Sequence, residues 1–198
     1  MQHVTIEQLI ETSEKMDATK HDFTVAPSNS GFKNGQFVTG GEMGKTFYQV
    51  EDYALGQVAE RLGIPVSYLK RCPDGLRDTN LNYWMWGQRG KRGQDKPWLV
   101  RTDSSNVRAF LSEVYRPVNN TEVLTIASEL LGDTDYKLLR PHVGRDDMHL
   151  RAVILDGVGR DGNYGIGAYL GNGETGNRSL TVAPFLMRTS CTNSTVWI

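Results

Sequence analysis

The sequence predicts an α+β fold: a mostly antiparallel β-sheet built from hairpins, a helical segment near residues 51–86, and a helix packed across the sheet. Residues 98–115 and 136–156 each contain two runs of β-branched, aromatic and aliphatic residues around a polar turn, which is typical of a β-hairpin. Residues 51–62 and 120–131 instead carry apolar residues at helical spacing. The predicted fold class rests on these two patterns.

Length and composition indicate an ordinary soluble protein. A chain of 198 residues can bury one good core. We therefore expect one α+β domain, with an N-terminal part over residues 1–97 and a hairpin–helix–hairpin core over residues 98–198. The 21 glycines favour turn-rich β structure. The net charge of −1 argues against a protein that coats nucleic acid by bulk charge and leaves room for a local basic patch.

Nothing in the sequence predicts a membrane or secreted protein. No apolar run approaches the length of a membrane span, and residues 1–17 lack the basic and then apolar segments of a secretory signal. The two cysteines, Cys72 and Cys191, are far apart in the sequence, and we expect both to be reduced, as is the default in the cytosol. We therefore expect a cytoplasmic protein with no cofactor and no bound metal.

The first fifty residues predict one helix and several short strands. Thr5 and Gln8 fit a capping box at the start of a helix that extends to Met16. Residues 28–35 are rich in Ser, Asn and Gly and predict a loop. The predicted strands cover residues 21–26, 37–39 and 46–50.

Two helices separated by a tight turn are predicted next. Residues 51–62 carry an apolar stripe, Gly63 suits the C-terminal cap, and Pro65 opens a second short helix over residues 66–71. The same spacing fits a helix-turn-helix, in which the second helix would read DNA. Its reading residues would be Ser67, Tyr68, Lys70 and Arg71. An ordinary compact helical corner gives the same pattern, and we favour that interpretation.

The stretch after this corner carries the strongest functional signal in the sequence. Residues 76–86 predict a third helix, or a helix that turns into a strand near its end. Aromatic side chains there precede a glycine-rich basic loop, and the residues concerned are Tyr83, Trp84, Trp86, Arg89, Lys91 and Arg92. Aromatic faces stack on unpaired bases, while Lys and Arg neutralise phosphates. A packed aromatic cluster beside a solvated loop explains these residues equally well.

The first predicted hairpin places two arginines across from each other. If residues 103–106 form the loop, Thr102 pairs with Val107. Arg101 then lies opposite Arg108. Like charges in direct opposition repel, so such a pair needs a neighbouring carboxylate or an external anion. Two solvated arginines on a sheet face are the favoured interpretation, and a register slip of one residue would separate them.

The second half of the chain repeats this pattern after a helix. Residues 120–131 predict a helix with a broad apolar face that lies across the sheet. In the hairpin that follows, a four-residue loop places His142 opposite His149. The same register places Arg140 opposite Arg151, and a second arginine pair favours an anion-facing sheet surface. The histidines have no third metal ligand in sequence reach, so surface or hydrogen-bonded histidines are favoured.

A glycine-dense segment precedes the last predicted strand. Gly157, Gly159 and Gly162 match the G-x-G-x-x-G of dinucleotide-binding proteins, which requires a helix after the motif. Residues 164–170 predict a strand instead, so we treat the match as chance. The last predicted strand contains Pro184, which indicates a sheet edge or a bulge.

Two segments together resemble a known family. The first reads V-R-T-D-(x)-V-R-A-F-L-S-x-x-Y-R-P-V-N-N-x-E-V-L, and the second reads N-G-E-T-G-(x)-S-L-T-V-A-P-F-L-M-R-T-S-C-T-N. They lie within residues 98–193 and look like the phage/plasmid-like family known as domain of unknown function 932. The resemblance implies a bacterial, phage or plasmid setting and brings no reaction. A link to recombination or single-strand handling is a hypothesis that we add to it.

The favoured functional hypothesis is a non-enzymatic phage or mobile-element protein that binds nucleic acid, preferably single-stranded DNA, in recombination or replication. Assembly into a homo-oligomer would concentrate positive charge despite the nearly neutral monomer. The expected binding residues are Tyr83, Trp84, Trp86, Arg89, Lys91, Arg92, Arg101 and Arg108, with Arg140 and Arg151 as a weaker extension.

Two alternatives belong to other classes. One is a phage structural, assembly or host-interaction protein that acts through protein–protein contacts, for which the amphipathic first helix and the apolar residues 196–198 are the motivation. The other is a metal-dependent nuclease that uses Asp146, Asp147 and Asp156, although acidic residues in turns are usually only turn formers.

Overall fold

A computed structural model describes residues 4–40, 44–87, 96–158, 164–188 and 196–197. Its fold is α+β with mostly antiparallel sheets, as the sequence predicts. Residue contacts divide the chain into two compact units, which we call the central unit (Thr19–Arg116) and the terminal unit (Met1–Ala18 with Pro117–Ile198). Each unit has its own sheet and its own hydrophobic core.

This division differs from the expected single domain whose two parts meet at residue 97. The predicted first hairpin does not share a sheet with the second one. Its strands, β5 (Trp98–Asp103) and β6 (Asn106–Ser112), pair with earlier strands of the central unit. The reason is that β5 has a second neighbour, β1 (Lys20–Val25), along its whole length.

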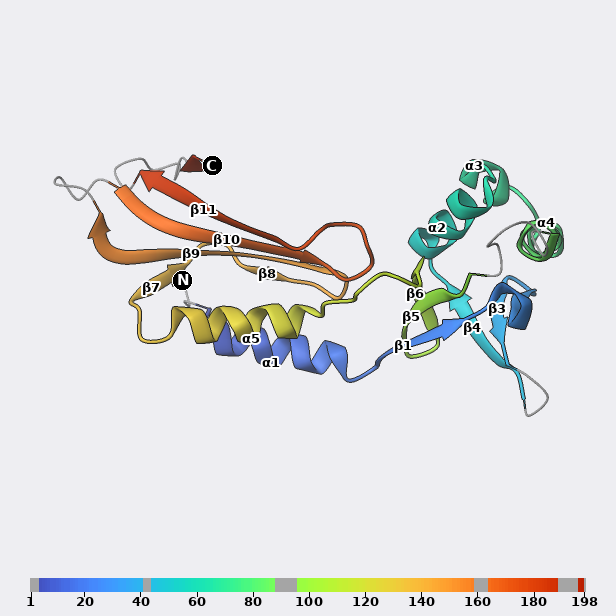
Figure 1. The fold of residues 1–198 in the computed structure, drawn as a ribbon, viewed down its shortest axis with the longest axis horizontal. Helices are drawn as coiled ribbons and strands as arrows, with labels where there is room; N and C mark the ends of the chain where they lie inside the picture. The colour runs from blue at the N-terminus through green and yellow to red at the C-terminus, as the bar shows by residue number, and fades with distance from the viewer. Residues whose placement is uncertain (1–3, 41–43, 88–95, 159–163, 189–195, 198) are drawn as a thin grey trace. The chain divides into compact units, whose positions relative to one another are not determined.

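The sheet of the central unit has the strand order β1-β5-β6-β4-β3-β2 (Figure 1). The β4–β6 pair is parallel, and the other neighbouring strands are antiparallel. The remaining elements of this sheet are a short 3-10 helix (Pro27–Asn29), β2 (Ser30–Lys33), β3 (Gln36–Thr39) and β4 (Thr46–Val50).

Three helices pack against this sheet and share one core with it, which confirms the predicted helical segment. They are α2 (Asp52–Leu62), α3 (Val66–Leu69) and α4 (Asp74–Gly87). The core joins apolar side chains of the helices and strands, among them Phe37, Val58, Leu69, Leu81, Val100 and Phe110. Gly63 ends α2 with a φ of 70°, a left-handed conformation that glycine adopts without a Cβ penalty.

The helix-turn-helix alternative lacks a recognition helix. Its second helix, α3, has four residues and therefore spans about one turn. Lys70 forms an ion pair with Asp52, and the Nε of Arg71 donates to the carbonyl of Ser67 at 3.1 Å. A one-turn helix whose two cations bond to residues of α2 and α3 fits an ordinary compact helical corner. This is the interpretation that the sequence favoured.

One hairpin of the central unit was not predicted. Residues 28–35 were expected to form a loop, whereas β2 and β3 pair directly around Asn34 and Gly35. These two residues have positive φ angles of 53° and 76°. Asn-Gly is the preferred sequence for a two-residue hairpin turn with positive φ, so the signal was present in the sequence.

The β5–β6 hairpin departs from its predicted register at a bulge. Thr102 pairs with Val107, as predicted, around a turn tighter than the expected four residues. The register then shifts, and Arg101 pairs with Ala109. Arg108 is the extra residue that the shift leaves in β6, as in a β-bulge. The predicted pairing of Arg101 with Arg108 is therefore wrong.

The sheet of the terminal unit is antiparallel, with the order β12-β11-β10-β9-β7 and with β8 also paired to β9 (Figure 1). Its strands are β7 (Tyr136–Leu138), β8 (His142–Val143), β9 (Asp147–Val158), β10 (Tyr164–Gly173), β11 (Thr181–Arg188) and β12 (Val196–Trp197). A strand rather than a helix thus follows residues 159–163, as predicted. Pro184 lies in β11, where the described residues of β12 pair with Leu186 and Met187.

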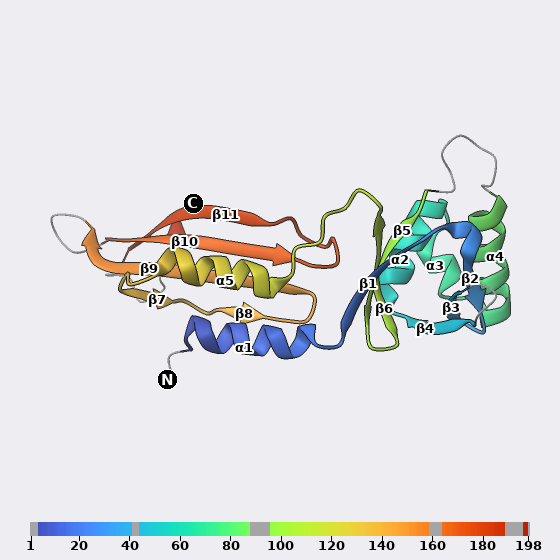
Figure 2. The same cartoon turned by 60° about the horizontal axis from the view of Figure 1, so that its bottom comes forward.

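Two helices, α1 (Ile6–Asp17) and α5 (Asn120–Leu131), lie side by side on one face of this sheet (Figure 2). The predicted capping box of Thr5 and Gln8 starts α1. Both helices contribute to the core of the terminal unit, which includes Ile6, Leu9, Leu124, Met148 and Leu150. The predicted helix across the sheet is therefore confirmed. None of the described helices combines the length and apolar character needed to cross a membrane.

The second predicted hairpin is interrupted. His142 pairs with His149, as predicted. Between β7 and β8, however, Arg140 has a φ of 45° and lies outside the ladder. The N–H of Leu139 donates to the carbonyl of Arg151 at 2.8 Å, at the position predicted for Arg140. The predicted pairing of Arg140 with Arg151 is therefore wrong.

Candidate nucleic-acid interface

Part of the sheet face that points away from α1 and α5 in the terminal unit carries polar and cationic side chains, beside the apolar Val153 and Phe185. Side chains alternate along a strand, so Met148 and Leu150 enter the helix-covered core while His149 and Arg151 point the other way. Neither helix of the terminal unit covers this second face (Figure 1). We call it the open face and define it by Lys137, His142, His149, Arg151, Tyr169 and Arg178.

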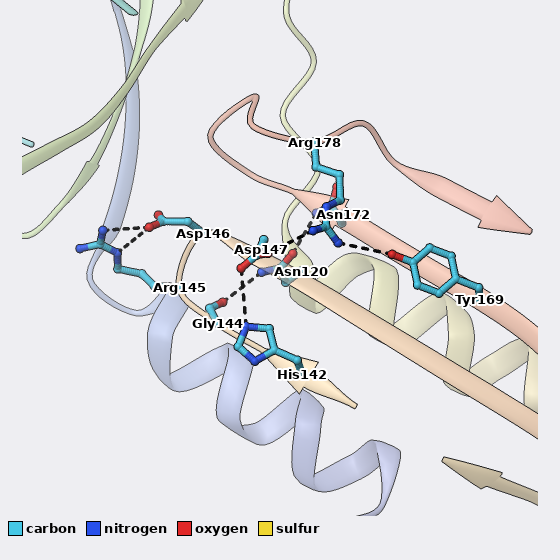
Figure 3. A network of polar contacts seen from close by, with 9 residues as sticks. All are labelled: Asn120, His142, Gly144, Arg145, Asp146, Asp147, Tyr169, Asn172 and Arg178. Atoms are coloured by element: carbon cyan, nitrogen blue, oxygen red, sulfur yellow. Dashed lines mark hydrogen bonds and ion pairs between the residues drawn. The ribbon is translucent and has the colours of Figure 1, made fainter. Parts of the chain in front are cut away.

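A tyrosine lies between two arginines at the centre of the open face. Tyr169 on β10 pairs with Arg151 on β9, and the Arg151 guanidinium lies over the Tyr169 ring, 5.6 Å from its centroid. Arg178, from the β10–β11 loop, donates through Nη1 to the Tyr169 hydroxyl at 3.3 Å (Figure 3). The ring and two permanently charged groups are thus held together, partly exposed, on one surface.

Two stacked histidines continue this surface. The rings of His142 and His149 are 5.3 Å apart with an interplanar angle of 28°. Asp147 lies close to a histidine and an arginine: its Oδ1 is 3.6 Å from Nε2 of His142, and its Oδ2 is 3.8 Å from Nη2 of Arg178 (Figure 3). One carboxylate therefore faces several groups that are positive or can become positive.

The surroundings of His149 disfavour its charged form. Burial lowers the pKa of His149 below its usual value of 6.5, and the nearby His142, Arg151 and Arg178 lower it further, while Asp147 opposes them. His149 is therefore mainly neutral near pH 7. An added anion would favour its protonation for the same electrostatic reason, so this side chain responds to a bound phosphate.

Two glycines of β10 allow neighbouring side chains to lie close against the strand. A Cβ on Gly167 would lie 2.5 Å from the Phe185 ring, and a Cβ on Gly173 would lie 2.3 Å from the side-chain oxygen of Asn177. Because Gly167 has no side chain, Phe185 can lie flat across β10 and is buried. This packing accounts for Gly167 and Gly173, whereas Gly159 and Gly162 of the G-x-G-x-x-G match lie outside the described residues.

A buried polar network fixes the end of β10 to the start of α5. Asn172 donates through Nδ2 to the carbonyl of Val118 at 2.8 Å and to Oδ1 of Asn120 at 3.0 Å. Asn120 in turn donates through Nδ2 to the carbonyl of Gly144 at 3.2 Å (Figure 3). The Glu174 carboxylate accepts the backbone N–H of Asn120 at 2.9 Å and thereby caps α5.

This network connects the two segments that carry the family resemblance. Asn120 belongs to the first segment, and Asn172 and Glu174 belong to the second. All three side chains are buried, so their role in the described structure is to hold the fold together. The sequence pattern identified these residues but gave no sign that they meet.

The predicted aromatic residues lie at the C-terminal end of α4, in the central unit. Tyr83, Trp84 and Trp86 are exposed, and Tyr83 shows 67% of its surface. The rings of Tyr83 and Trp84 meet edge to face at 5.4 Å, whereas Trp86 donates through Nε1 to the carbonyl of Ser30 at 2.9 Å. The predicted basic residues that follow them, Arg89, Lys91 and Arg92, lie outside the described residues.

The two predicted arginines of the first hairpin do not lie on an accessible surface. Arg101 and Arg108 are each about 1% exposed. Arg101 donates through Nε to Asp22 at 2.9 Å, and Asp22 faces it from β1. Burial of the Arg101 charge is tolerable because this carboxylate pairs with it. The expectation that Arg101 and Arg108 contact phosphate is corrected, since a phosphate cannot reach them in this structure.

Of the seven predicted binding residues that the structure describes, Arg151 alone belongs to the open face. Arg140 is exposed at the break between β7 and β8. Sequence reasoning missed Lys137, Tyr169 and Arg178; the available signal was the alternation of polar and apolar residues along the predicted strands. Alternation alone could not reveal which face the helices leave open.

The residues of the nuclease alternative make other contacts. Asp146 pairs with Arg145 at 2.9 Å, while Asp147 faces His142 and Arg178. The side chain of Asp156 lies outside the described residues. Within the described part of the chain, no three His, Cys, Asp or Glu side chains gather in a way that could hold a metal ion.

Comparisons with known proteins leave this surface without a precedent. No family model, no curated protein and no solved structure matches the chain. The resemblance to domain of unknown function 932 therefore stays a prediction, and the function has to be argued from the chemistry of the residues.

Proposed function

We propose that this protein binds nucleic acid, with single-stranded DNA as the favoured ligand, on the open face of the terminal sheet. The single observation that carries the proposal is the Tyr169 ring held between Arg151 and Arg178. An unpaired base can stack on an aromatic or guanidinium plane, while the guanidinium groups pair with phosphates. A duplex hides its base faces, so this chemistry favours a single strand.

The flanking residues support the same ligand. Lys137 adds a cation on β7, and the stacked pair of His142 and His149 offers further donors beside Arg178. Asp147 is the acidic group that these histidines and Arg178 face on this surface. The net positive charge of the open face supplies the local basic patch that the overall charge of −1 does not exclude.

Tyr83 and Trp84 on α4 form a second proposed contact in the central unit. Their exposed edge-to-face pair offers stacking surface of the kind expected from the sequence. Trp86 has its indole nitrogen fixed to Ser30 and its ring half exposed. The open face and this aromatic pair are separate elements of the proposal and can be tested one at a time.

The proposed setting is a phage or mobile element, with a non-enzymatic role in recombination or replication. It rests on the family resemblance and on our added hypothesis of single-strand handling. A homo-oligomer that aligns several open faces would extend the binding surface along a strand.

The test is fluorescence anisotropy of a labelled single-stranded oligonucleotide, titrated with the full chain at low and moderate salt, with a duplex as the comparison. We expect strand-selective binding that weakens steeply with salt. Tyr169→Ala should weaken binding by about tenfold because one stacking surface is lost. Tyr169→Phe keeps the ring and should bind nearly as the parent does.

Arg151→Ala should weaken binding and reduce the dependence of log affinity on log salt by about 1, because one phosphate contact is lost. The matched control is Lys15→Ala, which removes an exposed cation that pairs with Glu11 on α1. Normal binding by Tyr169→Ala and Arg151→Ala, with unchanged circular dichroism, would exclude the open face. A loss confined to Trp84→Ala would assign binding to α4 instead.

A further inference from the structure

An apolar groove lies on the helix-covered side of the terminal sheet, opposite to the open face. It has a volume of about 320 Å³ and runs between α5 and the strands β10 and β11. Its lining is apolar throughout; the main contributors are Val123, Ile126, Leu130, Leu170, Leu180 and Val182. The groove plays no part in the proposed nucleic-acid binding, because residues on opposite faces of a sheet point in opposite directions.

The groove exists because two helices cover only part of the sheet. α1 and α5 pack over β7, β8, β9 and part of β10, and neither covers the strip along β11 (Figure 2). Leu130 and Val182, on its two sides, are 79% and 69% exposed. Ile166 and Leu186 form a cross-strand pair on this side and extend the exposed apolar strip. Apolar surface of this continuity usually marks an interaction site.

The helical rim of the groove is acidic. Glu122 and Glu129 are exposed on α5 and lie four and three residues from Ile126, so all three share one side of the helix. The sequence of α5 contains no Lys or Arg. The opposite wall, residues 180–187 of the loop and β11, also carries no charged residue. The charge along the groove is therefore negative.

We propose that this groove binds an amphipathic helix whose apolar row is flanked by Lys or Arg. The groove follows α5 over about two turns, so an occupant would insert apolar residues at positions i, i+3 or i+4, and i+7. Basic residues beside that row would meet Glu122 and Glu129. A second copy of the chain fits less well, because its own α5 would bring two acidic rims together.

The probe is a fluorescein-labelled, helix-forming peptide of about 14 residues with leucines at helical spacing flanked by lysines. A second peptide has glutamates in place of the lysines, and a third keeps the composition of the first with its leucines out of phase. Anisotropy titrations against the full chain should give binding of the lysine peptide that is about tenfold tighter than binding of either other peptide.

Variants assign the binding to the groove. Leu130→Glu and Val182→Glu each place a charge on an exposed position of the wall, so folding should be retained and binding of the lysine peptide lost. The matched control is Val114→Glu, which changes an equally exposed apolar residue of the central unit and should bind normally. Charge reversal by Glu122→Lys with Glu129→Lys should make the glutamate peptide the tighter ligand.

Three outcomes would overturn the proposal: equal binding of the in-phase and out-of-phase peptides, normal binding by Leu130→Glu, or no change of preference on charge reversal. Light scattering tests whether a second copy of the chain occupies the groove instead of a helical peptide. A concentration-dependent dimer that Leu130→Glu abolishes would assign the groove to a second copy of the chain. The anisotropy of the labelled oligonucleotide is recorded with the same variants, so loss of peptide binding is distinguishable from loss of nucleic-acid binding.

Discussion

Arginines on the two sheets illustrate opposite uses of the same residue. In the central unit, Arg101 and Arg108 are buried, and Arg101 pairs with Asp22 on the neighbouring strand. In the terminal unit, Arg151 and Arg178 contact the ring and hydroxyl of Tyr169 on a surface that neither α1 nor α5 covers. Arg101 is paired with a carboxylate within the fold, whereas Arg151 and Arg178 lie on a surface that an anion can reach. Strand position alone does not distinguish them.

The largest expected effect comes from Arg101→Met, which tests the structural half of this comparison. The substitution removes a buried guanidinium and its charged hydrogen bond to the partly exposed Asp22, so we expect the central unit to lose about 3 kcal/mol of stability. Urea unfolding monitored by tryptophan fluorescence measures this change, because most tryptophans lie in the central unit. Arg151→Met is the matched variant and should cost less than about 1 kcal/mol. Equal costs would remove the distinction between the two sheets.

Asn172→Ala should have the next largest effect, this time on the terminal unit. The change removes two donated hydrogen bonds and leaves the carbonyl of Val118 and the side chain of Asn120 without them in a buried site. We expect a loss of about 2 kcal/mol in urea unfolding. Asn80→Ala is the control because the hydrogen bonds of its amide are exposed. A cost no greater than that of the control would contradict the structural role of the network.

A pH effect on the open face should be smaller. The pKa of His149 is lowered in the folded state, so the unfolded chain binds more protons between that lowered pKa and 6.5. The His149 contribution is thus fully present above pH 6.5 and is lost as the pH falls through this window. His149→Gln should flatten the decline of the urea midpoint between pH 7.5 and pH 5.5.

His149 should also make nucleic-acid binding depend on pH over the same range. A phosphate beside His149 favours its protonated form, so nucleic-acid binding should strengthen as the pH falls from about 7 to about 6. His149→Gln should lose most of this increase in anisotropy titrations, whereas His21→Gln, a change in the central unit, should keep it. An identical pH profile for both variants would place the bound phosphates elsewhere.

Arg140→Gly should have the smallest effect. Arg140 holds a left-handed φ of 45°, which costs energy for a residue with a Cβ and none for glycine. The greater freedom of glycine in the unfolded chain offsets part of this gain, so we expect a stabilisation of about 0.5 kcal/mol. Thermal unfolding with Arg145→Gly as the control would measure it. A clear destabilisation would indicate that Arg140 has contacts like those of Arg101.

Local sequence patterns predicted most helices and strands of the fold and some residues of the candidate site. The capping box at Thr5, the stripe of α2 and the broad apolar face of α5 each depend on residues a few positions apart. Trp84, which the sequence singles out as an aromatic residue beside a basic loop, is exposed, and its binding role stays a prediction. Such patterns are readable because helix and strand periods fix which neighbours share a face.

The pairing of residues on different strands could not be predicted in the same way. The bulge at Arg108 separated the expected arginine pair, and the break at Arg140 separated the second one. A shift of one residue reverses the direction of every side chain that follows it, so a small local error changes the predicted site. The contact between Arg178 and Tyr169 joins a loop to a strand, which no spacing rule anticipates.

The α+β class, most helix boundaries and several strands could be predicted from the sequence, because they depend on local propensity and periodicity. The three-dimensional fold was needed to show that residues 6–17 join α5 in one unit and that the first hairpin joins the other. It also decided which arginines are buried and which are open. Burial depends on what covers each face of a sheet, and that is set by contacts between segments far apart in the chain.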